Sequence, residues 1–222
     1  MTIPVPLDQR AETHMRRTTR PRLLAIWLIF GAASIGPGLV TAATLVRDNN
    51  RAIADYNEAI RIDPDYADAF YGRGNAWSEK FDDARALADY NEAIRLDPNH
   101  AAALNNRGAA WLAMGQNDRA VADFSAAIRV DPRDADYYNN RGNAWHLKGD
   151  NDRAIVDYDE AIRLNPRDPC PLYNRGSAWQ AKGDLDRALA DYDEAIRVAP
   201  NYRCWGVKRK TIAPVLGLRG AP

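Results

Sequence analysis

Hydrophobic and polar positions follow the period of an amphipathic helix, and the whole pattern returns at a constant interval along the chain. In residues 151–164 the apolar side chains have the i, i+1, i+4, i+7, i+8 spacing of one helical face: Ala154, Ile155, Tyr158, Ala161 and Ile162. Residues 135–147 predict a partner helix before it. Five prolines mark the interval of 34: Pro64, Pro98, Pro132, Pro166 and Pro200. A fixed period of this length predicts one supersecondary unit, copied and stacked.

The residues between the two helices of a copy indicate how each helix ends. Between them lies Lys148-Gly149-Asp150. Gly149 can take the left-handed conformation that ends the first helix, and Asp150 can cap the second. Pro166 stops the second helix, since proline cannot continue it. The sequence therefore predicts a helix–turn–helix in every copy.

Small and aromatic residues recur at fixed places in the copies. They are a glycine (Gly74, Gly108, Gly142, Gly176), a tryptophan (Trp77, Trp111, Trp145, Trp179), two alanines (Ala86, Ala120, Ala154, Ala188 and Ala93, Ala127, Ala161, Ala195) and an aromatic ring (Tyr90, Phe124, Tyr158, Tyr192). This pattern resembles the tetratricopeptide repeat family. The resemblance implies an all-α fold, an α-solenoid of helix–turn–helix repeats wound as a right-handed superhelix. It covers four complete repeats over 67–202, after a half repeat over 50–66.

One departure from the family recurs, because arginine replaces the usual leucine before the glycine. The arginines are Arg73, Arg107, Arg141 and Arg175. An arginine on a packed face needs a carboxylate partner or a route to water. Aspartates on the second helices, Asp89, Asp123, Asp157 and Asp191, are the candidate partners. One hypothesis is a ladder of Arg–Asp pairs that joins the repeats; the other is that each arginine extends to solvent.

Composition and motifs exclude several functions. The chain has 30 basic and 30 acidic residues, so nothing indicates a nucleic-acid partner. The pairs Arg153–Asp157, Asp159–Arg163 and Asp193–Arg197 have i, i+4 spacing and predict salt bridges on a solvated helix surface. Histidines, cysteines and acids lack metal-ligand spacing, and no phosphate-binding loop or nucleophile motif is present. We therefore expect no enzyme activity, no cofactor and no metal.

The N-terminal segment predicts export. A basic segment, 1–22, precedes the mainly apolar run Leu23–Val46. That run is interpreted either as a cleaved signal peptide or as a transmembrane anchor, and a start at Met15 would give a compact basic leader. Both interpretations place the repeats across a membrane, in a bacterial periplasm, outside the cell, or anchored with the repeats outside the cytoplasm. A third possibility is that the run packs as the first helix of the half repeat.

The C-terminal tail, 203–222, breaks the pattern. Residues 203–212 are compatible with a short basic helix, but Pro214 and the glycines after it prevent its continuation, so we expect a poorly ordered tail. Cys170 and Cys204 lie one repeat period apart, at equivalent places in successive units. Stacked helices separate such positions by about 8–10 Å. A disulfide needs Cα atoms within about 7 Å, so we predict no intramolecular disulfide.

The resemblance implies a concave groove lined by the first helices, in which partners of this family bind. The candidate residues are Tyr71, Asn75, Asn105, Asn106, Asn139, Asn140, Asn143, His146, Tyr173, Asn174 and Ser177. Asparagine offers both donors and acceptors and suits an extended peptide backbone. The alternative is that these asparagines only satisfy local helix hydrogen bonds.

Two functions follow from these observations. The first is a non-enzymatic protein–protein interaction scaffold that binds a protein or peptide in the groove. The second is an assembly module that self-associates through uncapped repeat ends. Family members that clamp a terminal carboxylate of chaperones use cations, where this chain has Tyr71, Asn105, Asn139, Ala102, Asp136 and Cys170. We therefore exclude that co-chaperone role.

Overall fold

The computed structural model describes residues 42–200, with side chains described from residue 48, and every regular element in this range is an α-helix. The chain divides into two compact units, Met1–Met114 and Gly115–Pro222. The first unit contains α2 (Ala42–Ile62), α3 (Ala67–Glu79), α4 (Asp83–Leu96) and α5 (Ala101–Ala113). The second contains α6 (Asn117–Val130), α7 (Ala135–Leu147), α8 (Asn151–Leu164), α9 (Pro169–Ala181) and α10 (Leu185–Val198).

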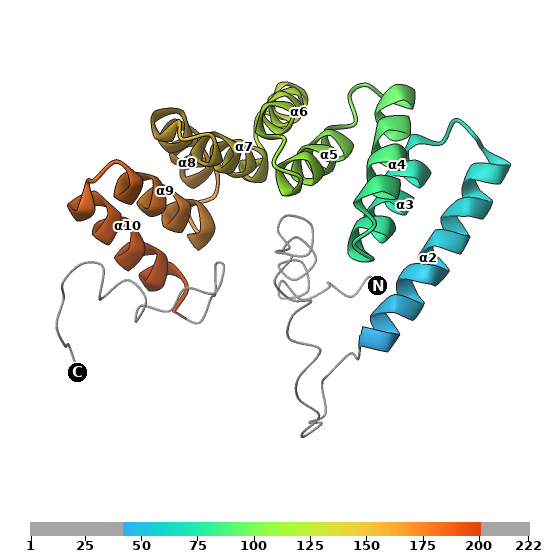
Figure 1. Ribbon diagram of the computed structural model, residues 1–222, viewed down its shortest axis with the longest axis horizontal. Coiled ribbons are helices and arrows are strands. Elements are labelled where there is room, and N and C mark those ends of the chain that lie inside the picture. The colour runs from blue at the N-terminus through green and yellow to red at the C-terminus, as the bar shows by residue number, and fades with distance from the viewer. Residues whose placement is uncertain (1–41, 201–222) are drawn as a thin grey trace, which may run out of the picture. The chain divides into compact units, whose positions relative to one another are not determined.

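Each complete repeat within a unit is a helical hairpin. The pairs α3–α4, α7–α8 and α9–α10 pack along their lengths, and α5 packs on α4 as α9 packs on α8 (Figure 1). The predicted bounds of the first and second helix, 135–147 and 151–164, are those of α7 and α8. Helix α2 begins at Ala42, before the expected half repeat, so the end of the apolar run Leu23–Val46 belongs to this helix.

The turn of each hairpin has the conformation that the sequence predicts. Gly149 has a φ of 82°, and the Asp150 carboxylate accepts a hydrogen bond from the Arg153 backbone N–H at 3.1 Å. Gly115 and Gly183 have φ values of 74° and 82°. The equivalent residue of the first hairpin is Phe81, with a φ of 62°. A phenylalanine there is strained, because its Cβ crowds the backbone in the left-handed region.

The recurring glycine and aromatic ring form one packing unit. A Cβ on Gly142 would lie 2.6 Å from Cε1 of Tyr158, whose side chain is fully buried. The same contact joins Gly74 to Tyr90 and Gly176 to Tyr192, at 2.7 and 2.8 Å. Tyr158 lies in a buried cluster with Ala154, Ile155 and Ala178. The ring therefore fills the space that the missing side chain leaves, and so the two helices approach closely.

The predicted Arg–Asp pairs form at three repeats, but each lies within one repeat, and a different nitrogen of the arginine makes the contact to the preceding repeat. Nε and Nη2 of Arg141 donate to the two carboxylate oxygens of Asp157 at 2.8 and 2.7 Å. The remaining nitrogen, Nη1, donates to Ser125 Oγ on the preceding repeat at 3.2 Å. Arg73 bonds in the same way to Asp89 and Asn57, and Arg175 to Asp191 and Asp159. Each arginine thus closes its own hairpin and joins it to the one before.

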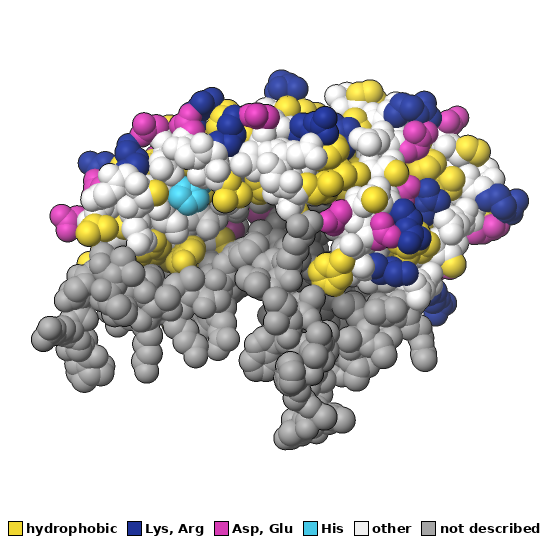
Figure 2. Space-filling view, viewed as in Figure 1, with side chains coloured by type: hydrophobic (Ala, Val, Ile, Leu, Met, Phe, Trp, Pro, Cys, Tyr) yellow, Lys and Arg dark blue, Asp and Glu magenta, His cyan; other side chains and the backbone are white. Residues whose placement is uncertain are grey.

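The predicted i, i+4 salt bridges are wrong. Arg153 pairs with Asp150 instead of Asp157, because Arg141 already binds the buried Asp157 carboxylate. In the other two cases a glutamate three residues earlier binds the guanidinium through both oxygens: Arg163 with Glu160, and Arg197 with Glu194. On the side of the molecule that Figure 2 shows, basic and acidic side chains are mixed over the described residues, with no large patch of one sign.

Several predictions concern residues outside the described range. They are the basic segment 1–22, the greater part of the run Leu23–Val46, the tail 203–222 and Cys204, so the predictions of export, tail disorder and an absent disulfide remain predictions. Between residues 42 and 200, no helix is both long and apolar enough to cross a membrane.

Candidate functional site

Each of the two units has a candidate binding face, formed by the first helices of its own repeats. In the first unit it joins Asn75 on α3 to Asn106 on α5. The Asn106 Nδ2 group donates to Asn75 Oδ1 at 2.7 Å, and the Tyr90 hydroxyl donates to the same oxygen at 2.9 Å. Since its amide oxygen is occupied twice, Asn75 has its NH2 group left for a ligand.

Two rings in tilted contact lie beside this pair. The rings of Tyr71 and His100 are 4.7 Å apart, and the Tyr71 hydroxyl accepts from Asn106 Nδ2 at 3.4 Å. His100 Nδ1 caps α5 by accepting from the Ala103 backbone N–H, so its proton resides on Nε2, 3.0 Å from Asp68 Oδ1. Two hydrogen bonds thus hold the histidine in place, and it supports Tyr71 from one side.

In the second unit the face carries one fixed donor and one fixed acceptor. The Tyr158 hydroxyl donates to Asn143 Oδ1 at 2.8 Å, which leaves the Asn143 NH2 group for a ligand. The Asn174 Nδ2 group donates to Asn139 Oδ1 at 2.9 Å, which leaves the Asn174 carbonyl oxygen. Asn143 and Asn174 are half-buried, so both groups lie near the surface without being fully solvated.

The other predicted site residues divide by burial. Asn105, Asn139 and Asn140 are buried, so they can act on a ligand only through their neighbours. Tyr173 is half-buried, and its ring lies 5.2 Å from that of Tyr192. The Ser177 hydroxyl lies 3.2 Å from the Tyr173 carbonyl oxygen, to which it donates. His146 Nδ1 lies 2.6 Å from Asn151 Oδ1, so its proton is on that nitrogen.

The tyrosines that orient these asparagines were not predicted as site residues. Burial raises the pKa of Tyr90 and Tyr158, so their hydroxyls stay protonated donors at neutral pH. The sequence does contain a signal for these tyrosines, because a first-helix position and the aromatic position of the second helix have the same spacing in every repeat. The pairs are Asn75 with Tyr90, Ala109 with Phe124, Asn143 with Tyr158 and Ser177 with Tyr192. The polar partner is therefore absent at the one repeat whose ring lacks a hydroxyl.

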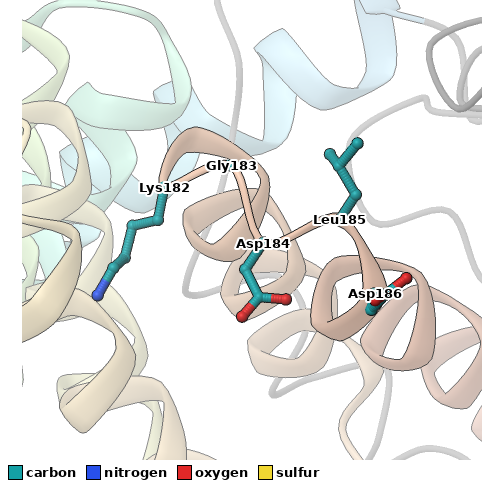
Figure 3. A pocket seen from close by; sticks show the side chains of 5 residues that line it. All are labelled: Lys182, Gly183, Asp184, Leu185 and Asp186. Carbon is teal, nitrogen blue, oxygen red and sulfur yellow. The ribbon is translucent and has the colours of Figure 1, made fainter.

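Other concave or titratable features do not form a site. An open depression of about 460 Å³ lies at the α9–α10 turn, lined by Lys182, Gly183, Asp184, Leu185 and Asp186. Leu185 points away from the Lys182 and Asp184 side chains, so the lining groups do not converge (Figure 3). No group of three or more His, Cys, Asp or Glu side chains within residues 48–200 is arranged to hold a metal ion.

Family models identify the repeats. Models described as tetratricopeptide repeat match residues 110–169 and 169–202, and one described as TPR repeat matches 48–80 and 82–115. The fold is an all-α helical repeat solenoid, and the chain belongs to the tetratricopeptide repeat family. The comparison with curated proteins gave no match.

Solved structures with the same fold include three repeat proteins. MamA from Desulfovibrio magneticus RS-1 is 22% identical, with a TM-score of 0.64, covering 71% of this chain and 95% of that chain. YrrB, described as a TPR protein with an unusual peptide-binding site, is 24% identical, with a TM-score of 0.61, covering 71% and 81%. A thermophilic TPR protein from Thermus thermophilus is 22% identical, with a TM-score of 0.59, covering 70% and 86%.

Proposed function

We propose that the chain is a non-enzymatic interaction scaffold that binds an extended peptide through the peptide's main chain. The observation that carries this proposal is the fixed orientation of Asn143 and Asn174. One offers an NH2 donor and the other a carbonyl acceptor. A peptide backbone presents the complementary groups, a carbonyl oxygen and an N–H, whatever its side chains are.

The environment of the two amides favours a neutral ligand. Neither is next to a lysine or arginine in its hydrogen-bond network, which contains only tyrosine and asparagine groups. A carboxylate would gain no ion pair there and would lose hydration. Tyr173, half-buried on the same helix as Asn174, adds an amphipathic ring, a type of contact that gives area at low entropic cost.

The comparisons support the class of function. A peptide-binding site is stated in the description of YrrB, which shares the fold with this chain. The binding residues of YrrB are not transferred to this chain, because at 24% identity the likeness shows the fold alone. The side chains assigned here therefore rest on the hydrogen bonds of α7, α8 and α9 alone.

The test uses a phage-displayed library of random peptides, selected on the full chain. Asn143→Ala alone would leave the buried Tyr158 hydroxyl without its acceptor, so the variant is Asn143→Ala with Tyr158→Phe. This double change copies the natural pair Ala109 and Phe124 of the second repeat and is expected to fold. We expect selected peptides to bind this variant about three- to tenfold more weakly, as for the loss of one hydrogen bond.

One control and one further variant separate the face from the rest of the surface. Asn99→Ala removes an exposed loop asparagine that makes no side-chain hydrogen bond within residues 48–200, and it should leave affinity unchanged. Asn174→Ala should weaken binding as the α7–α8 double variant does. Equal affinity of all these variants for the selected peptides would contradict the proposal.

A further inference from the structure

The side-chain oxygens on the candidate face of the first unit already accept hydrogen bonds from within the protein. Asn75 Oδ1 accepts from Asn106 Nδ2 at 2.7 Å and from the Tyr90 hydroxyl at 2.9 Å. Asn106 Oδ1 accepts from Asn105 Nδ2 at 3.2 Å, and the Tyr71 hydroxyl oxygen accepts from Asn106 Nδ2 at 3.4 Å. The acceptors of this face are therefore engaged before a ligand arrives.

Two donors of the same face have no partner within residues 48–200. They are the Asn75 NH2 group and the proton of the Tyr71 hydroxyl, since both side chains otherwise take part only as acceptors. In that range the one side-chain polar atom that is both buried and unpaired is Asn117 Oδ1, so the Asn75 NH2 group reaches solvent. Both donors adjoin the Asn106 amide, so they belong to one small area.

The charge beside these donors disfavours an anionic ligand. Asp68 Oδ1 lies 3.0 Å from His100 Nε2, and the His100 ring lies 4.7 Å from that of Tyr71. The Asp68 side chain is 69% exposed, so it stays hydrated beside the ring pair. Within residues 48–200 no lysine or arginine bonds to Tyr71, Asn75 or Asn106. A carboxylate or phosphate would therefore meet repulsion and no cation, which leaves a neutral carbonyl oxygen as the fitting acceptor.

We propose that the face formed by Tyr71, Asn75 and Asn106 binds a proline-rich segment of a partner, whose carbonyl oxygens accept from Asn75 and Tyr71. An ordinary residue brings an N–H with each carbonyl, and on this face that N–H would lose water without gaining an acceptor. Proline has no N–H, so it avoids this cost. Its ring packs on the half-buried Tyr71 ring, as proline-rich segments pack in grooves lined by aromatic side chains.

Tyr71 is held in place for such a contact. His100 packs against its ring, and the Ala103 backbone N–H fixes His100 by donating to Nδ1 at 3.2 Å. The Tyr90 ring lies 6.2 Å from the Tyr71 ring on another side. A ring that is already oriented loses little entropy when a ligand binds, so it suits the rigid polyproline conformation.

The second unit does not offer the same group of donors. Ser177 takes the place of Asn75 there, and its hydroxyl donates to the Tyr173 carbonyl oxygen at 3.2 Å. Asn174 leaves a carbonyl acceptor, which suits a peptide N–H and gains nothing from proline. The inference rests on the proposed peptide-binding function, and it names the class of peptide for the first unit alone.

The test compares three neutral peptides, each acetylated and amidated, in titrations of the full chain followed by NMR of the asparagine NH2 groups. They are hexaproline, a sarcosine hexamer that lacks both N–H and ring, and an alternating Ser-Gly hexapeptide that retains every N–H. We expect hexaproline to shift the Asn75 signals and to bind about tenfold more tightly than the Ser-Gly peptide. The sarcosine hexamer should bind with intermediate affinity.

Two conservative variants test the donors without disturbing their neighbours. Asn75→Asp keeps an oxygen for Asn106 and Tyr90 but removes the NH2 group, and it should weaken hexaproline binding about tenfold. Tyr71→Phe keeps the ring and removes the hydroxyl, with an expected loss of about three- to tenfold. Asn99→Ala, in an exposed loop of the same unit, should leave the affinity unchanged.

Three results would overturn the proposal. They are equal affinity for hexaproline and the Ser-Gly peptide, hexaproline shifts at Asn143 and Asn174 in place of Asn75, and unchanged hexaproline affinity in both variants. Each result would leave the scaffold function standing if library-selected peptides still depend on Asn143 and Asn174. Conversely, selected peptides that ignore those two residues would count against the scaffold proposal and leave proline binding at Asn75 to be judged by its own titration.

Discussion

Replacing Arg141 with leucine should destabilise the second unit strongly. The substitution removes two hydrogen bonds to Asp157, at 2.8 and 2.7 Å, and one to Ser125 at 3.2 Å. The Asp157 side chain is only 5% exposed, so its charge would remain buried without a partner. Breaking a fully buried pair costs about 3–5 kcal/mol. Because the Arg141 side chain is 23% exposed, we expect about 2–4 kcal/mol.

Urea unfolding followed by circular dichroism measures this loss, with two matched variants. Ser125→Ala removes only the bond to the preceding repeat and should cost about 0.5–1.5 kcal/mol. Arg141→Leu with Asp157→Leu removes both charges and should regain most of the stability.

The pH dependence of the Arg141→Leu variant gives a second check. Burial already raises the pKa of Asp157, and the guanidinium opposes that rise. Without the guanidinium, the folded-state pKa lies further above the unfolded value, so the penalty is greatest at neutral pH and disappears as the carboxyl protonates. An unchanged free energy of unfolding at pH 7 would refute the reasoning.

Three further predictions concern single residues. Phe81→Gly should stabilise the chain by about 0.5–1 kcal/mol in urea unfolding, because it relieves a left-handed conformation. Gly142→Ala should cost about 1–2 kcal/mol by the same assay, since its Cβ meets Tyr158 at 2.6 Å. The side chain and backbone N–H of Arg153 lower the pKa of Asp150, so its contribution is lost as pH falls below about 4. Asp150→Asn should therefore lose less thermal stability between pH 5 and 3, measured by melting curves.

The sequence predicted the features that follow from the repeat period. The bounds of α7 and α8, the left-handed Gly149 and the Asp150 cap are all local, so their residues indicate them directly. The left-handed conformation of Phe81 was not predicted. Phe81 aligns with the glycines of the other turns, but a phenylalanine does not by itself indicate a positive φ. The Arg141–Asp157 pair was predicted because its geometry repeats with the period.

The candidate site was less predictable. The sequence indicates which helices carry asparagines, but the group that each amide presents depends on a buried hydroxyl on another helix. Tyr158 thus decides the orientation of Asn143, and this follows only from packing. The predicted Arg153–Asp157 salt bridge failed for a similar reason, since Asp157 faces inward to Arg141 and is unavailable to its own helix.

The most direct test of main-chain recognition changes the peptide backbone and leaves the protein intact. A peptide selected on the full chain is synthesised with single N-methyl groups along its length, and each analogue is measured by isothermal titration calorimetry. We predict that one or two positions lose about tenfold in affinity, and that these losses vanish in the Asn174→Ala variant, whose carbonyl acceptor is gone. Uniform tolerance of N-methylation, with affinity set by side chains alone, would contradict the account.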